Sequence, residues 1–119
     1  MKRILAVDDS KPLRKMLCDV LRKAGHDVVE AEDGKEGLDR LREQMPDIVI
    51  TDLTMPVMNG LDFIEAARGD PKGKDLPMLL LTTETADHLK SRAREIGATG
   101  WLTKPFDADQ ILRLVDQLA

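Results

Sequence analysis

Short apolar runs alternate with segments of helical periodicity along the whole chain, and this alternation limits the possible folds more than any other feature. Each run is too short for a helix, and several are rich in β-branched residues, as expected for buried strands. Repeated strand–helix alternation predicts βαβ units, right-handed crossovers, a parallel sheet and helices on both faces. The predicted strands are residues 4–7, 28–31, 48–50, 78–81 and 101–102.

Capping residues mark where several of the predicted helices begin. Asp33 is followed three positions later by Glu36, and Asp107 by Gln110, which is the spacing of a helix N-cap and its first turn. Asn59 is expected to cap another helix. The segment 86–96 aligns only three apolar residues, so this helix should keep much of its surface in water and be able to move.

Two predicted helices carry a full apolar face, at the start and at the end of the chain. Gly25 follows the first of them, where a left-handed C-cap is favoured. The only cysteine, Cys18, lies inside this pattern and is expected to behave as a small hydrophobic residue. The faces consist of Leu13, Met16, Leu17, Val20, Leu21 and Ala24, and of Ile111, Leu114, Val115 and Leu118.

The size and charge of the chain exclude several classes of protein. A length of 119 residues suits one compact domain. The net charge of −4 leaves no extended cationic surface for a phosphate backbone, so nucleic-acid binding is not expected. The first apolar run is too short for a secretory signal, and no segment approaches the roughly 18 apolar residues of a membrane span. We therefore expect no membrane association and a cytoplasmic location.

Side chains that could form a chemical site follow the first, third, fourth and fifth predicted strands. The carboxyl ends of parallel strands meet at one edge of a sheet, where such proteins bind their ligands. Carboxylates, hydroxyls and one ammonium group should therefore gather at that edge. These residues are Asp8 and Asp9 after the first strand, Asp52 after the third, Thr82 and Thr83 after the fourth, and Lys104 and Pro105 after the fifth.

Each of these residues also has an ordinary structural explanation. An Asp after a strand can cap a helix or open a turn, and the Thr82 hydroxyl can bond to the backbone. Carboxylates forced close together, however, repel one another unless a cation or a proton intervenes. Oxygen ligands at a site open to water suit Mg²⁺ better than Ca²⁺. We therefore expect Asp8, Asp9 and Asp52 to bind magnesium.

A cation at this edge would let an anionic phosphoryl donor approach a carboxylate. Asp52 could then attack as a nucleophile and form an aspartyl phosphate. The long side chain of Lys104 is able to reach one phosphoryl oxygen, and the hydroxyl of Thr82 is able to donate a hydrogen bond to another.

The motifs, in this order and spacing, resemble the receiver domains of bacterial two-component response regulators, most closely the stand-alone, CheY-like chemotaxis kind. The resemblance covers the whole chain. It rests on Val7-Asp8-Asp9-Ser10, Asp52, Met55-Pro56, Asn59-Gly60, Leu81-Thr82, Gly97-Ala98 and Lys104-Pro105-Phe106.

This resemblance implies a flavodoxin-like α/β fold. The expected architecture is a three-layer (βα)5 doubly wound sandwich around a five-stranded parallel sheet in the order 2-1-3-4-5. Residues 1–119 are expected to form a single receiver domain without an effector domain. The sequence leaves open that the chain was excised from a longer regulator.

The resemblance also implies roles for the residues at the strand ends. Asp52 is the residue that becomes phosphorylated, and the backbone carbonyl of Thr54 joins the three aspartates as a magnesium ligand. Thr82 and Lys104 contact the phosphoryl group, and the Lys104–Pro105 peptide is cis. Thr54 and Glu84 occupy variable positions that influence the lifetime of the phosphate.

Three residues are implied to form a switch: Thr82, Trp101 and Pro105. The family usually carries a Tyr or Phe that swings between two rotamers at the position of Trp101. The larger indole ring could be hindered in this movement, and the alternative is a Trp that simply packs at the edge of the sheet.

The implied function is a phosphorylation-activated switch. The donor would be a phosphohistidine on a sensor histidine kinase or a phosphotransfer domain, and the chain would be a monomer that phosphorylates and dephosphorylates itself rather than a turnover enzyme. Its target would be a protein such as a flagellar motor component or a phosphatase, in chemotaxis or motility. The alternative is a phosphate sink or relay without its own target.

Two other functions fit the same pattern less well. A flavin-binding module with this sheet order would want a hydroxyl- and glycine-rich phosphate loop after the first strand, where Asp8 and Asp9 would repel a phosphate. A metal-dependent phosphatase with an Asp nucleophile would usually place two aspartates two positions apart after the first strand, and here they are adjacent.

Overall fold

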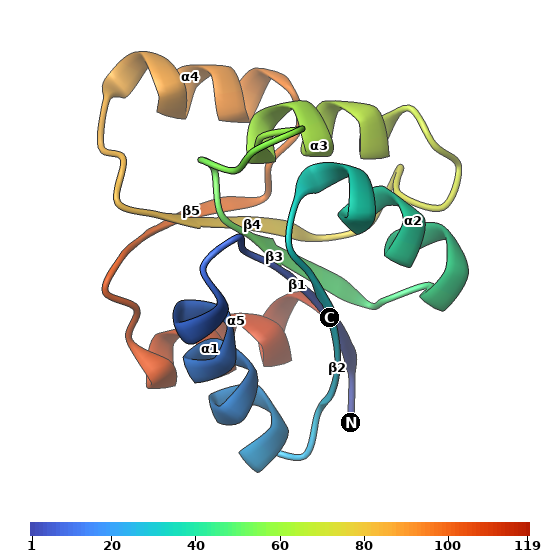
Figure 1. Ribbon diagram of the computed structural model, residues 1–119, viewed down its shortest axis with the longest axis vertical. Coiled ribbons are helices and arrows are strands. Elements are labelled where there is room, and N and C mark those ends of the chain that lie inside the picture. The colour runs from blue at the N-terminus through green and yellow to red at the C-terminus, as the bar shows by residue number, and fades with distance from the viewer.

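The computed structural model describes the whole chain, residues 1–119, as five strands that alternate with five helices (Figure 1). The predicted alternation is confirmed, and each strand extends one or two residues beyond its apolar run. The elements are β1 (Arg3–Val7), α1 (Lys11–Lys23), β2 (Asp27–Ala31), α2 (Gly34–Gln44), β3 (Ile48–Thr51), α3 (Gly60–Arg68), β4 (Met78–Thr82), α4 (Asp87–Glu95), β5 (Gly100–Thr103) and α5 (Ala108–Leu118).

The strands form one parallel sheet in the order β2-β1-β3-β4-β5, as the resemblance implied. In the pairing of β1 with β3, Val7 lies opposite Thr51. The residues that follow these two, Asp8 and Asp52, therefore leave the sheet side by side. In the pairing of β4 with β5, Thr82 lies opposite Thr103, so Lys104 begins at the same edge.

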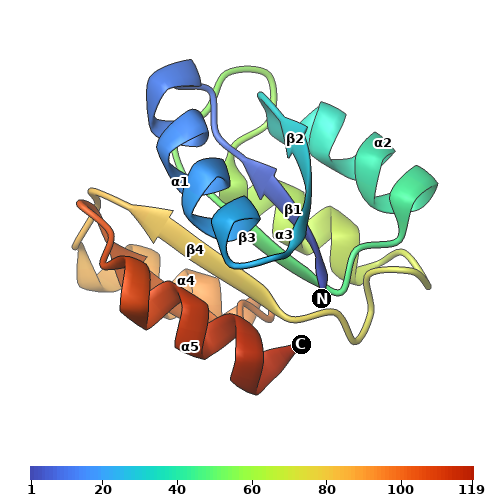
Figure 2. The same cartoon turned by 90° about the horizontal axis from the view of Figure 1, so that it is seen from below.

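Helices cover both faces of the sheet, and the molecule has three layers. Helices α2, α3 and α4 lie on one face and α1 and α5 on the other (Figures 1 and 2). Because successive side chains of a strand point to opposite faces, Leu5 and Val7 belong to the core under α2 to α4. Ile4 and Ala6 belong to the core above α1 and α5. None of the five helices is long and apolar enough to cross a membrane.

The predicted helix caps are present. The side chains of Asp33, Asn59 and Asp107 each accept a hydrogen bond from a backbone N–H in the first turn of α2, α3 and α5. Gly25 has φ +91°, in the left-handed region predicted for it. The sequence therefore predicts correctly where α2, α3 and α5 begin and where α1 ends.

The apolar face predicted for α1 is only partly correct. The buried residues of this helix are Leu17, Cys18 and Leu21. Leu13 and Met16, assigned to the core from their spacing, are 40% and 56% exposed. Their side chains line a groove of about 650 Å³ beside the start of α5, so the apolar stripe of α1 extends past the sheet into an open furrow.

Cys18 is a core residue, as predicted for a small hydrophobic side chain. Burial raises the pKa of its thiol to about 11, with the charge of Glu30 acting in the same direction. The thiolate form is therefore absent at neutral pH, and the side chain is chemically inert there.

Helix α4 is anchored as lightly as its sequence predicts. Ala93 is its only fully buried residue, and Ile96 follows directly at its C-terminal end. The N-cap position is Ala86, which offers no side-chain hydrogen bond to the first turn. The N-terminal end of α4 therefore lacks a stabilisation that is typically worth about 1 kcal/mol.

Val57 holds the only strained backbone conformation of a β-branched residue. It has φ 68° in the connection between β3 and α3, and the N–H of Met58 donates to the carbonyl of Pro56 across it at 2.7 Å. The side chain is 77% exposed, so packing does not compensate for the strain.

Val57→Asn is therefore expected to raise the free energy of unfolding by about 1 kcal/mol, because Asn adopts the left-handed conformation at lower cost. Urea unfolding at constant slope measures the gain. Val57→Ile is the control: it keeps the branch at Cβ and should leave the unfolding midpoint where it is. Equal midpoints for all three proteins would show that the turn is not strained.

Candidate functional site

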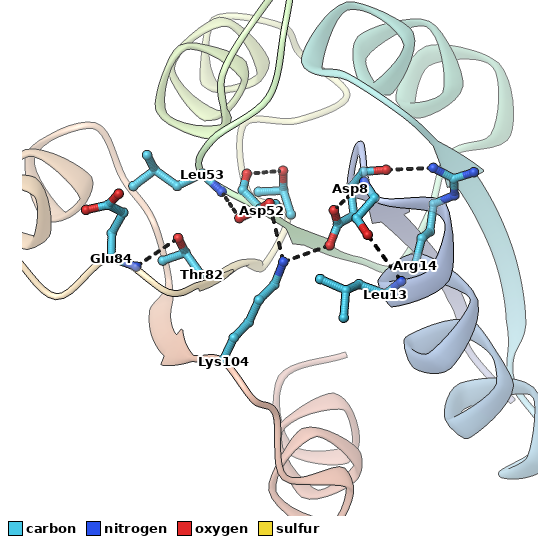
Figure 3. Close-up of polar contacts among 10 residues, drawn as sticks. Asp8, Leu13, Arg14, Asp52, Leu53, Thr82, Glu84 and Lys104 are labelled. Atoms are coloured by element: carbon cyan, nitrogen blue, oxygen red, sulfur yellow. Dashed lines mark hydrogen bonds and ion pairs between the residues drawn. The ribbon is translucent and has the colours of Figure 1, made fainter.

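Side chains from three strand ends meet at the carboxyl edge of the sheet (Figure 3). The Nζ atom of Lys104 donates to Oδ2 of Asp8 at 2.9 Å and lies 3.3 Å from Oδ2 of Asp52. These side chains are 11%, 7% and 12% exposed, respectively. The structure thus brings together, in a largely dehydrated place, three charged residues that are far apart in the sequence.

Lys104 stays protonated in this setting. Burial by itself would lower the pKa of its ammonium group, but the hydrogen bond to Asp8 and the charge of Asp52 outweigh burial and raise that pKa. The ammonium group is therefore a permanent positive charge between two carboxylates. It lies close enough to Asp52 to contact a group bound to that carboxylate.

Asp52 lies farther from the Lys104 ammonium group than Asp8 does. Its Oδ1 atom accepts a hydrogen bond from the backbone N–H of Leu53 at 2.7 Å. Burial raises the pKa of this carboxyl group above its ordinary value, the charge of Asp8 adds to the rise, and Lys104 offsets it only in part. One ammonium group is therefore not enough to neutralise the acids around it.

The backbone of the β1–α1 connection holds Asp8 in place. The N–H of Asp8 continues the sheet ladder by donating to Ala31 at 3.0 Å. The N–H of Ser10 donates to Oδ1 of Asp8 at 2.9 Å, and the Ser10 side chain caps α1. One carboxylate oxygen of Asp8 is thus held by the turn, and the other faces Lys104.

The acid cluster fits a divalent cation. Asp8, Asp9 and Asp52 each present a carboxylate oxygen, and these atoms lie within 4.8 Å of one another. Asp9 is exposed and has no ion-pair partner, so its carboxylate is free to turn toward a cation. Three carboxylates against one ammonium leave a net negative charge that a hard, oxygen-preferring cation would balance. The residues present therefore suit Mg²⁺.

Thr82 and Glu84 flank the site on the side of β4. Thr82 is buried, and its Oγ1 accepts a hydrogen bond from the N–H of Glu84 at 3.2 Å. The hydroxyl of Thr82 is thus bonded to the backbone, the ordinary explanation considered for it, while its proton stays available for donation. Thr54, two residues after Asp52 in the chain, is exposed, as is Thr83.

Trp101 lies at the start of β5, away from the acid cluster and against α4. Its ring is half-buried on the core under α4, and Nζ of Lys90 lies 6.0 Å from the ring centroid. Its indole Nε1 is buried without a hydrogen-bond partner. Trp101 therefore packs against the helix with the weakest anchoring. Pro105 follows a cis peptide bond with Lys104, as the resemblance implied.

An acidic site bridged by a lysine, at the carboxyl edge of a parallel sheet in the order 2-1-3-4-5, defines the class of receiver domains. The chain belongs to the response regulator receiver domain family, whose model matches residues 4–116. It is thus a receiver domain of two-component signalling.

Full-length relatives narrow the comparison within this family. The chain is 34% identical to Protein PilH of Pseudomonas aeruginosa, over 98% of the chain and 96% of that protein. It is 35% identical to Chemotaxis protein CheY of Thermotoga maritima, over 99% of the chain and 98% of that protein. The structure of the chemotaxis response regulator CheY4 of Vibrio cholerae superimposes with a TM-score of 0.92 at 40% identity, covering 100% of this chain and 99% of that one. The chain is therefore a CheY-like receiver.

The chain spans about half the length of the first curated relatives it matches. The Phosphate regulon transcriptional regulatory protein PhoB of Escherichia coli is 34% identical over 93% of this chain, which corresponds to 48% of that protein.

Membership of the receiver domain family argues against the two other functions considered from the sequence, a flavin-binding module and a metal-dependent phosphatase.

Proposed function

We propose that Asp52 accepts a phosphoryl group from a phosphohistidine of a sensor histidine kinase or a phosphotransfer domain. The observation that carries this proposal is the pairing of a buried, incompletely neutralised Asp52 with Lys104. A carboxylate with a raised pKa and only one close cation is poorly stabilised, and a poorly stabilised anion is the better nucleophile.

The transfer would proceed at Oδ2 or Oδ1 of Asp52. The carboxylate oxygen forms a bond to phosphorus, the bond from phosphorus to the donor imidazole nitrogen breaks, and the imidazole keeps that electron pair. Asp8, Asp9, Asp52 and the carbonyl of Thr54 would hold Mg²⁺, which supplies the positive charge that lets a phosphoryl anion approach carboxylates. Lys104 and the Thr82 hydroxyl would each contact a phosphoryl oxygen, through an ammonium and a hydroxyl donor.

Hydrolysis of the aspartyl phosphate would return the chain to its starting form. The chain would therefore modify itself once in each cycle, and it would not turn over a free substrate. Thr54 comes two residues after Asp52 and is exposed, and Glu84 comes two residues after Thr82 and is half-buried. Both would influence how easily water reaches the phosphate.

The output would follow from the added charge, about −1.5 to −2 at pH 7. Thr82 would have to turn toward the phosphoryl group, and its present bond to the N–H of Glu84 ties it to the loop that leads into α4. The uncapped start of α4 and the unpartnered Nε1 of Trp101 mark where repacking costs least. A shift from 1:99 to 99:1 takes about 5.5 kcal/mol, the order of two or three charge-assisted hydrogen bonds made in one state only.

The similarity to the chemotaxis proteins CheY and CheY4 supports a target in chemotaxis or motility, reached through the face that α4 and Trp101 form. The target would be a protein that binds this face in one of the two states only. The chain itself would act as a monomer in the cytoplasm.

The test is phosphorylation with acetyl phosphate, with and without Mg²⁺, followed by intact mass and by Trp101 fluorescence. Trp101 is the only tryptophan, so its emission reports on one place. We expect a gain of one phosphoryl group and an emission change that both require Mg²⁺ and both disappear in Asp52→Asn. A phosphoryl group that persists in Asp52→Asn would refute the assignment of the acceptor.

Thr82→Ala separates phosphorylation from switching in the same experiment. This variant keeps Asp52 and Lys104, so it should still gain the phosphoryl group, but its Trp101 emission should change less than in the parent. Full emission change in Thr82→Ala would rule out coupling through this hydroxyl. Phosphorylation of the parent without any emission change would instead favour a phosphate sink or relay.

A further inference from the structure

Arg14 lies behind the acid cluster and makes a contact that sequence analysis does not anticipate. It belongs to the first turns of α1, and its side chain is only 14% exposed. Its Nη1 atom donates to the backbone carbonyl of Asp8 at 2.6 Å (Figure 3). Its Nε atom donates to Oε1 of Glu30 at 2.9 Å. The guanidinium group therefore joins the β1–α1 connection to β2.

The bond to the Asp8 carbonyl matters because this carbonyl belongs to the same peptide unit as the N–H of Asp9. A peptide unit is planar, so fixing the direction of the Asp8 carbonyl also fixes the direction in which the chain enters Asp9. The N–H of Asp8 is already held by Ala31 at 3.0 Å. With Arg14 in place, the backbone of Asp8 is held on both sides.

The position of Asp9 depends on the bond between Arg14 and the Asp8 carbonyl more than the positions of Asp8 and Asp52 do. Asp8 is fixed by Lys104 and by the Ser10 amide, and Asp52 by Lys104 and the Leu53 amide. No hydrogen bond or ion pair holds the exposed side chain of Asp9. Its place within 4.8 Å of the other ligand atoms therefore follows from the backbone on which it is mounted.

Glu30 keeps the guanidinium group of Arg14 in its orientation. Burial by itself would raise the pKa of Glu30, but hydrogen bonds from Arg14 and Arg22 outweigh it and hold that pKa below its ordinary value. Glu30 is thus charged at neutral pH. Because both ends of the Arg14 fork are engaged, the side chain has little freedom to release Asp8.

We propose that Arg14 is a positioning residue for divalent cation binding, acting through the Asp8–Asp9 peptide unit. The inference rests on the proposed Mg²⁺ site. It adds a residue that touches neither the cation nor the phosphoryl group. Supporting residues behind a metal ligand typically contribute about 10- to 100-fold to metal affinity.

The sign of the effect separates positioning from electrostatics. Arg14 carries a positive charge near a cation site, so if charge alone mattered, its removal would tighten Mg²⁺ binding. If Arg14 orients the Asp8–Asp9 peptide, its removal weakens Mg²⁺ binding despite the lost repulsion. The two explanations therefore predict opposite changes in Kd.

Arg22 offers a matched control on the same helix. Its Nη2 atom also bonds to Glu30, at 3.2 Å, but its second bond goes to the carbonyl of Val28 and not to Asp8. Arg22→Gln thus removes the same charge and the same type of ion pair, and it leaves the Asp8–Asp9 peptide unit clamped.

The experiment is a calorimetric titration of the full chain with magnesium chloride, in the parent, Arg14→Gln, Arg14→Lys and Arg22→Gln. We expect a Kd about tenfold higher for Arg14→Gln, an intermediate value for Arg14→Lys, and the parental value for Arg22→Gln. Thermal unfolding without Mg²⁺ should show that Arg14→Gln and Arg22→Gln lose similar, small amounts of stability. Amide exchange of Asp9 without Mg²⁺ should be faster in Arg14→Gln only.

An unchanged or lower Kd in Arg14→Gln would overturn the positioning role while the Mg²⁺ site of the proposed function stands. Equal weakening in Arg22→Gln would also overturn it, because the loss would then follow the Glu30 ion pairs. A parent that binds no Mg²⁺ would overturn the proposed function itself, together with this inference.

Discussion

Asp52→Asn should make the metal-free protein more stable at pH 7, by about 1–2 kcal/mol in the free energy of unfolding, although it removes the proposed acceptor. The substitution takes away the repulsion between Asp52 and Asp8 and the cost of burying a charge. It also takes away an attraction to Lys104, but that ammonium group keeps its closer partner, Asp8, at 2.9 Å rather than 3.3 Å. The amide oxygen of Asn can still accept from the Leu53 N–H.

The gain should depend on pH with a defined sign. The pKa of Asp52 in the folded protein is raised above its ordinary value of 3.8. At pH values between 3.8 and this raised pKa, the folded chain holds a proton that the unfolded chain has released. In this window the stability of the parent falls as pH rises, because the folded state binds more protons. Asp52→Asn has no such group. Its advantage should therefore be absent below pH 3.8, grow above it, and be complete at neutral pH.

Mg²⁺ should cancel this advantage. A cation that binds only the folded parent stabilises it by about 1.4 kcal/mol at ten times the Kd, and Asp52→Asn, with one ligand fewer, should gain less. Urea unfolding at several pH values, with and without Mg²⁺, measures both effects. Lys104→Met is the opposite control and should destabilise the protein, because it leaves two buried carboxylates without their ammonium group. If Asp52→Asn were less stable than the parent at pH 7 without Mg²⁺, the acid cluster would not be electrostatically strained.

The sequence predicted those parts of the fold that depend on local patterns. A few neighbouring residues determine each of these features, and all of them are present in the structure. They are the strand runs, the light anchoring of α4, and the caps at Asp33, Asn59 and Asp107. The positions of Asp8, Asp52 and Lys104 at one edge followed from a single topological rule, because parallel strands end on the same side. The strand order itself came from the family resemblance.

Features that depend on packing between distant segments were missed. Leu13 and Met16 have the spacing of a buried stripe, yet they are exposed and line an open groove beside the start of α5. Arg14 bonds to a backbone carbonyl, which carries no signal in the sequence, and only the neighbouring Glu30 could have hinted at it. The strained conformation of Val57 was also invisible, because nothing in the residue type favours it.

Gly60 is a further case in which the reason for a residue lies in a distant contact. Asn59-Gly60 was part of the resemblance to receiver domains, but the sequence did not explain why the second position is glycine. In the structure, the first turn of α3 rests directly on the backbone of Asp52, the proposed phosphorylation site. The N–H of Gly60 donates to the carbonyl of Leu53 at 2.7 Å. A Cβ atom at Gly60 would meet the carbonyl oxygen of Asp52 and lie 2.9 Å from Cα of Leu53.

Gly60→Ala is therefore expected to lower the free energy of unfolding by about 2–4 kcal/mol, because the obstacles are backbone atoms that cannot turn aside. The added methyl group must push α3 away from β3 or tilt the peptide of Asp52, so the Kd for Mg²⁺ should rise as well. Gly69→Ala, at the other end of the same helix, is the matched control. Its Cβ would meet nothing closer than 3.5 Å, its φ of −79° suits any residue, and its stability should stay within about 1 kcal/mol of the parent. Urea unfolding of the two variants and titration with Mg²⁺ make the comparison. Equal stability of the two variants would mean that α3 can shift without strain, and that its contact with Asp52 does not hold this residue in place.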